Sequence, residues 1–194
     1  MLRDAIRAVT AVLVLTLVCG VVYPAAVWAI GQGAFSRQAN GSIVRVDGRD
    51  VGSSSIGQTF TSARYFHGRP TALAVDGREL YDASTSGGSN LGPSSKALAT
   101  LVAGRLKAVE QTYGVTARQV PADMVTASFS GLDPDISVRN ATIQAPVVAR
   151  ARGIRLAEVL DLIRVRTDDP TLGFLGTTRI NVLDLNLALD RSAA

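Results

Sequence analysis

Residues 8–30 contain no charged side chain, and this one stretch limits what the chain can become more than any other feature. Eleven of its positions are Val, Leu or Ile, each of which favours insertion into a bilayer by about 0.3–0.6 kcal/mol. A helix over these residues would be about 35 Å long, whereas a bilayer hydrocarbon core is about 30 Å thick. The sequence therefore predicts a transmembrane helix over residues 8–30.

The charges beside this stretch predict its direction. Arg3 and Arg7 lie in the short segment 1–7 and, by the positive-inside rule, should stay in the cytoplasm. Residues 31–194 would then be extracytoplasmic. A cleaved signal peptide is the alternative, but its apolar core would normally be only about 7–15 residues long. Pro24 has no N–H to give to a helix and is expected to bend this one.

The composition of the remainder suits one folded domain, residues 31–194. The chain has a net charge of +4, but its arginines are scattered singly and are not interleaved with aromatic residues, which argues against nucleic-acid binding. The same charge is compatible with contact to anionic lipid headgroups. The single cysteine, Cys19, lies inside the apolar stretch, so the chain cannot form an internal disulfide.

The first half of this domain is predicted to be rich in β-structure. Asp47-Gly48 separates two β-prone runs and is typical of a tight type I′ hairpin turn. A second Asp-Gly pair occurs at residues 76–77. Between the two pairs, residues 56–60 and 64–66 are interpreted as short extended pieces.

The second half is predicted to be helical, which makes the whole an α+β domain. Apolar residues recur at helical spacing after the cap at residues 93–95, and Gly114 ends that helix. Pro146 is predicted to open a short helix that ends at Gly153, and residues 156–163 form another. For the closing stretch, residues 180–190, the pattern leaves helix and strand open; we favour helix because Asn181 and Asp184 resemble a capping pair.

The sequence offers few candidates for catalytic or metal-binding residues. His67 is its one histidine, so a Ser-His-Asp or Cys-His mechanism would have to use it as the base. The acidic pairs Asp133/Asp135 and Asp168/Asp169 could supply oxygen ligands to a cation, but acids beside proline are more often turn formers. We therefore predict no metal site and no catalytic residue.

A glycine-rich run at residues 86–94 leads into the predicted start of a helix. Exposed N–H groups in such a loop can bind an anion. However, Lys96 does not stand in the register of a phosphate-binding loop. The residues alone favour a structural loop.

Taken together, many runs in a fixed order resemble the C subunit of the Kdp-type potassium-transporting ATPase, and the resemblance covers nearly the whole chain. The chain departs from the family pattern at Thr71, Phe129 and Asp135. The runs are Tyr23-Pro24 and residues 38–42, 56–60, 65–70, 86–91, 125–128, 130–133, 144–152, 181 and 185–190.

The resemblance implies a noncatalytic subunit of a bacterial plasma-membrane complex. Its partners would be a potassium-channel-like subunit, a P-type ATPase subunit that hydrolyses ATP, and a small single-helix subunit. The sequence lacks the D-K-T-G run that a P-type ATPase requires. The family is described as a catalytic chaperone that raises the ATP affinity of the pump subunit, so ATP and potassium would be handled by the complex and no cofactor would be held tightly here.

The resemblance also implies site residues. The nucleotide-linked candidates, by likeness to the signature of ABC transporters and to a family glutamine, are Ser86, Gly87, Gly88, Ser89, Asn90 and Gln144. The candidates for partner contact are Tyr23, Pro24, His67, Arg69 and Asp133. The alternatives left open are a membrane-anchored hydrolase that uses His67 and a stand-alone extracytoplasmic binding module.

Overall fold

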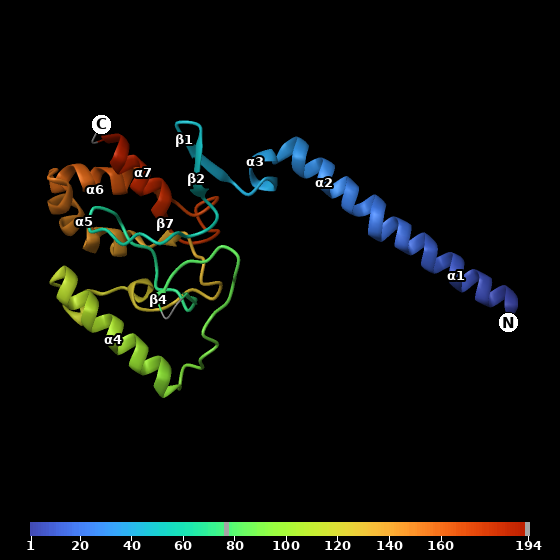
Figure 1. Ribbon diagram of the computed structural model, residues 1–194, viewed down its shortest axis with the longest axis horizontal. Coiled ribbons are helices and arrows are strands. Elements are labelled where there is room, and N and C mark those ends of the chain that lie inside the picture. The colour runs from blue at the N-terminus through green and yellow to red at the C-terminus, as the bar shows by residue number, and fades with distance from the viewer. Residues whose placement is uncertain (76–77, 193–194) are drawn as a thin grey trace. The chain divides into compact units, whose positions relative to one another are not determined.

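The computed structural model describes residues 1–75 and 78–192, without the side chains of residues 74, 75, 78 and 79 (Figure 1). The chain divides into two compact units, Met1–Ile43 and Val44–Ala194. The second Asp-Gly pair, at residues 76–77, lies outside the described residues. Each unit is described by itself below.

The first unit is dominated by one continuous helix, Leu2–Ala34, which is long and apolar enough to cross a membrane. It consists of α1 (Leu2–Leu17), a π-helical turn η1 (Val18–Val22) and α2 (Tyr23–Ala34), and a short α3 (Ser36–Ala39) follows. The π-helical turn contains Gly20 and ends two residues before Pro24, whose ring would clash with the Gly20 carbonyl in a regular α-helix. The helix therefore continues through the proline by widening one turn.

The predicted hairpin is confirmed. β1 (Ile43–Val46) and β2 (Arg49–Ser53) form a two-stranded sheet, and Asp47 and Gly48 both have positive φ angles, 51° and 76°, as a type I′ turn requires. Two further short strands, β3 (Ala74–Val75) and β4 (Arg78–Glu79), pair in antiparallel fashion. The predicted extended pieces at 56–60 and 64–66 belong to no strand.

The largest sheet is built from the second half of the chain, which the sequence had predicted to be helical. Its antiparallel strands β5 (Asp135–Ile136), β7 (Arg179–Asn181) and β6 (Thr167–Asp168) are ordered β5-β7-β6. Ile180, in the central strand, is fully buried. The fold is α+β, as predicted, with its strands spread over both halves.

Three of the predicted helices are confirmed and one was placed wrongly. Helix α4 (Lys96–Tyr113) is capped by Ser95, α6 spans Leu156–Val165, and α7 (Val182–Ser192) settles the closing stretch as mainly helix. Two 3₁₀ turns, η2 (Ala117–Gln119) and η3 (Ala122–Met124), follow α4.

Helix α5 (Val138–Arg152) does not begin at Pro146, as predicted, but contains it. The helix starts earlier because Ser137 caps it, accepting a hydrogen bond from the Asn140 N–H at 3.1 Å. Pro146 lies on the exposed side of α5, so the carbonyl that loses its helical partner can be hydrated. An N-terminal cap thus outweighed the proline as the start signal.

The hydrophobic core lies among α5, α6, α7 and the central strand β7 (Figure 1). Its one large aromatic side chain is Phe66, which comes from the irregular segment between β2 and β3 and is fully buried. Helix α4 contributes no buried residue. The irregular segment around Phe66 is therefore part of the core, and many of the residues described below lie in it or contact it.

Candidate functional site

The buried segment at Phe66 and His67 is held by two carboxamide side chains in place of a neighbouring strand. Asn186 on α7 accepts from the Phe66 N–H at 2.8 Å and donates to the Phe66 carbonyl at 2.9 Å. Gln144 on α5 does the same for His67, at 2.8 and 3.0 Å. Because buried backbone groups need hydrogen-bond partners, these two side chains allow an irregular segment to cross the core.

Gln144 is also tied to the start of its own helix. Its Nε2 donates to the Asn140 side chain at 2.8 Å, and Asn140 in turn donates to Asp123 at 3.0 Å. Asp123 accepts two further bonds, from the backbone and the hydroxyl of Ser137. Gln144, of which 3% is exposed, therefore makes all of these contacts inside the chain.

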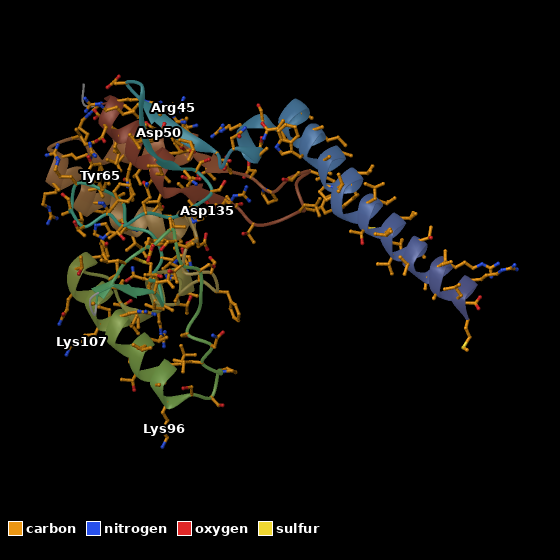
Figure 2. The ribbon with its side chains drawn as sticks, turned by 45° about the vertical axis from the view of Figure 1, so that its right-hand side comes forward. Arg45, Asp50, Tyr65, Lys96, Lys107 and Asp135 are labelled. Carbon is orange, nitrogen blue, oxygen red and sulfur yellow. The ribbon has the colours of Figure 1, made fainter. Side chains whose placement is uncertain are left out.

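A second polar cluster surrounds Arg152 at the end of α5. Its side chain is only 2% exposed, donates to the Arg64 carbonyl at 2.6 Å and pairs with Asp190 at 2.8 Å. The guanidinium lies over the ring of Tyr65, 4.8 Å from its centre, and the Tyr65 hydroxyl donates to Asp190 at 3.2 Å. Tyr65 is labelled in Figure 2. This cluster holds residues 64 and 65, directly before the buried Phe66, in place.

The ring of His67 is engaged with backbone. Its Nε2 lies 3.2 Å from the Ser62 carbonyl oxygen, a group that cannot serve as a nucleophile. As the base of a Ser-His-Asp or Cys-His mechanism, His67 would instead need a hydroxyl or thiol within hydrogen-bond reach. The geometry gives the hydrolase alternative no support.

Arg69 and Asp133 are brought together, as ion partners at 2.8 Å. Beside them, the Tyr81 hydroxyl donates to the Arg69 carbonyl at 2.8 Å, and burial raises the pKa of Tyr81 to about 12. Gly57 makes room for this cluster, because a Cβ there would lie 2.6 Å from the Asp133 carbonyl oxygen. Arg69 and Asp133, both named above as candidates for partner contact, therefore hold together two segments that are far apart in sequence.

The acidic pair at 133 and 135 shows no sign of a cation site. Asp133 is paired with Arg69, and Asp135 with Arg179 at 3.1 Å. Among the described residues, no group of three or more His, Cys, Asp or Glu side chains could hold a metal ion. Each carboxylate is neutralised by an arginine of this chain.

Asp135, labelled in Figure 2, gives the domain a pH-dependent contribution to stability. Its pKa is raised, chiefly by burial, although Arg179 opposes the shift. A carboxyl with a raised folded-state pKa favours the fold more as the pH falls through that pKa, so this contribution grows on acidification. We predict that, between about pH 7 and pH 4, acidification raises the unfolding midpoint of Asp135→Asn less, or lowers it more, than it does for the unsubstituted chain. An unchanged slope in urea titrations at several pH values would contradict it.

The glycine-rich run packs against a neighbouring turn. The Gly87 N–H donates to the Ser130 carbonyl at 2.8 Å, and the Ser86 hydroxyl donates to the same oxygen at 3.2 Å. Gly88 must be small, since a Cβ there would meet the Phe129 carbonyl oxygen at 2.9 Å. The run ends at residue 94, directly before Ser95, whose side chain caps the first turn of α4. The nucleotide-linked candidates within it, residues 86–90, lie ahead of this cap and are not part of the first turn of the helix.

A cavity of about 570 Å³ lies between this run and α4. Leu91, Leu98, Leu101 and Phe129 make much of its lining apolar. Arg105, the one basic residue among the described residues that line it, donates to the backbone carbonyls of Val125 and Thr71. Gln144 lines a different cavity, of about 260 Å³, so the nucleotide-linked candidates are not gathered at one place.

Tyr23 and Pro24 lie in the other unit, on the apolar helix, where the Tyr23 side chain is exposed. The sequence does not single out Asn186 or Arg152 as candidate residues, although each makes several hydrogen bonds inside the domain. The importance of Asn186 could have been predicted, because it stands on the apolar face of α7 between Leu185 and Leu189, where a polar side chain needs a hydrogen-bond partner.

The comparisons with known proteins concern nearly the full chain. The family model described as "KdpC: K+-transporting ATPase, c chain" matches residues 5–191. The potassium-transporting ATPase KdpC subunit of Mycobacterium tuberculosis (strain H37Rv) is 51% identical over 192 residues, which cover 98% of this chain and all of that protein. The subunits of the same name from Gemmatimonas aurantiaca and Janthinobacterium sp. are each 50% identical, over 93% and 91% of this chain and 88% and 92% of their own lengths. On this evidence the chain belongs to the KdpC family, the c chains of potassium-transporting ATPases.

Proposed function

We propose that this chain is a noncatalytic accessory subunit of an ATP-driven potassium uptake complex in a bacterial plasma membrane. The observation that carries the proposal is the family match over residues 5–191, which includes both the apolar helix and the α+β domain. The partners would be a potassium-channel-like subunit, a P-type ATPase subunit and a small single-helix subunit. The chain would stabilise this assembly.

The polar residues of the domain support a noncatalytic role. The hydrogen bonds of Gln144, Asn186 and Arg152 hold the chain's own backbone at residues 64–67, so these side chains have a structural role. The sequence contains no D-K-T-G run, so the phosphorylated aspartate of a P-type pump must belong to another subunit. ATP and potassium would then be bound by the partners, with no cofactor held tightly here.

The charges at the N-terminus support an orientation with the domain outside the cytoplasm. Arg3, Arg7 and the terminal amine outweigh Asp4 on the short side of the helix. Cytoplasmic ATP would then be on the opposite side of the membrane from the run at 86–90. A subunit that binds one conformation of the pump more tightly can still raise its ATP affinity, because coupling between sites needs no shared contact. We propose this indirect coupling.

Cysteine labelling in intact cells tests the orientation. In a Cys19→Ser background, Ser89→Cys and Ser192→Cys each place a thiol at an exposed position of the domain. Both should react with a membrane-impermeant thiol reagent before lysis, whereas Leu2→Cys, on the other side of the helix, should react only afterwards. Labelling of residues 89 and 192 only after lysis would reverse the orientation and bring direct nucleotide contact into consideration.

The assembly role has its own test. Deleting the chain should lower recovery of the other subunits as one complex and raise the ATP concentration needed for half-maximal hydrolysis by what remains. A complex that assembles fully and keeps its ATP dependence without this chain would overturn the accessory role.

A further inference from the structure

The loop that joins β6 to β7 ends in a small, ordered turn. Thr171 and Leu175 exchange two backbone hydrogen bonds, at 3.0 and 2.9 Å, and the Gly173 N–H donates to the Pro170 carbonyl at 2.9 Å. Leu172 has a φ of 56°, which is uncommon for a leucine. Figure 2 shows this part of the chain extending away from the body of its unit. We call residues 170–176 the apolar tip.

The side chains of the apolar tip face solvent. Leu172 is 79% exposed, Phe174 73% and Leu175 52%. Single exposed apolar residues are common on protein surfaces, but three within four positions on one ordered turn are not. The tip is therefore a concentrated apolar feature that the rest of the domain does not cover.

We propose that the apolar tip inserts into the interfacial region of the lipid bilayer and gives the domain a second attachment to the membrane. The proposal goes beyond the accessory role above, and it requires only that helix Leu2–Ala34 lie in a membrane. It does not depend on which side of the membrane carries the domain.

The length of the connecting chain favours a lipid surface as the occupant. Eight residues, 35–42, join the end of α2 at Ala34 to the start of β1 at Ile43. Even fully extended they reach only about 30 Å, so the domain stays close to the bilayer in which its helix lies. This tether keeps the domain beside a lipid surface, so an exposed apolar turn on the domain meets that surface at high effective concentration.

The form of the tip also suits lipid better than a protein groove. A single turn with three apolar side chains offers far less surface than a specific protein interface normally buries. Leu and Phe are the residue types that amphipathic elements place below the headgroups. Small or hydroxyl-bearing neighbours, Thr171, Gly173 and Gly176, allow the turn to enter without burying a charge.

The charges behind the tip carry no net positive charge. In the β6–β7 ladder Asp168 lies opposite Arg179, which also pairs with Asp135, and Asp169 and Arg166 lie beside Asp168 in sequence. Electrostatic attraction to anionic lipid is therefore not required, and apolar burial is the driving force. Insertion should occur in neutral phosphatidylcholine and should persist at high salt.

Tryptophan fluorescence tests the proposal on the full chain. Trp28 is the one native tryptophan, so Trp28→Phe combined with Phe174→Trp reports on the tip alone. The variant is reconstituted without other subunits into phosphatidylcholine vesicles, with or without bromine on the acyl chains near the headgroup. We expect brominated lipid to lower the emission at least about twofold, as for an interfacial side chain. The matched control, Trp28→Phe with Phe129→Trp, probes a different loop whose phenylalanine is 88% exposed and should be quenched much less.

Either orientation in the vesicle presents lipid to the tip, so the readout is independent of topology and of complex assembly. Emission at position 174 that brominated lipid leaves unchanged would overturn the proposal. Blue-shifted emission without quenching would overturn it too and would assign the tip to a second copy of the chain. A bimane probe at Leu172→Cys in a Cys19→Ser background provides an independent second measurement. Quenching by lipid is the expected result, and emission that lipid leaves unchanged would again overturn the proposal.

Discussion

Asn186→Leu is expected to lower the free energy of unfolding by about 3–5 kcal/mol, although leucine is the more hydrophobic residue. Asn186 is 1% exposed and satisfies both backbone groups of Phe66. With leucine there, a buried N–H and a buried carbonyl lose their partners at about 1–3 kcal/mol each. The branched side chain must also fit where a planar amide lay, which adds strain.

Denaturant titration of the full chain in detergent micelles, followed by circular dichroism of the α+β domain, measures this loss. The matched control is Gln111→Leu, the same kind of replacement on an exposed position of α4, which should change stability by less than about 0.5 kcal/mol. If the two substitutions have equal effects, the Asn186 amide does not hold the buried segment.

Elements with strong local signals could be predicted from the sequence. The apolar helix is determined by composition alone, and the first hairpin by one dipeptide, Asp47-Gly48, whose left-handed angles few other residue pairs accept. Helix α4 is determined by its Ser95 cap and by apolar residues at helical spacing. In each of these cases the deciding interactions lie within a few residues of one another.

The path of residues 56–70 could not be predicted in this way. The aromatic residues there suggest extended pieces, but neither piece joins a strand. Phe66 is buried, and its backbone partner, Asn186, lies 120 positions further along the chain. His67 and Gln144 are 77 positions apart. A side chain that replaces a neighbouring strand leaves no periodic pattern in either segment.

The candidate site was predicted only in part, since pairing in space is not encoded in the local motifs. Arg69 and Asp133 were both named, and the structure joins them as an ion pair. The run at 86–90 resembled a nucleotide signature, yet Gly87 and Ser86 donate to the Ser130 carbonyl, and Gln144 lines another cavity. Gly88 is needed because the backbone at Phe129 passes within contact distance, which the sequence alone cannot distinguish from the close approach of a ligand.

Gln144→Glu is expected to lower the free energy of unfolding at pH 7 by about 3–4 kcal/mol. The substitution replaces an NH₂ that donates to the His67 carbonyl and to Asn140 with an oxygen that can only accept. It also places a charge where 3% of the residue is exposed. Burial raises the pKa of the introduced carboxyl, so the penalty applies above that pKa and shrinks as the pH falls through it and the protonated group donates again.

This substitution separates a structural from a nucleotide-binding role for Gln144, because the two roles predict different pairs of results. If Gln144 acts by holding His67, the variant loses stability, and the ATP concentration for half-maximal hydrolysis changes only through loss of folded subunit from the complex. Acidification should then restore the unfolding midpoint toward that of the unsubstituted chain, while Gln144→Leu, which has no proton to gain, should stay destabilised. A Gln144→Glu chain of unchanged stability whose assembled complex needs much more ATP would instead place Gln144 in contact with nucleotide.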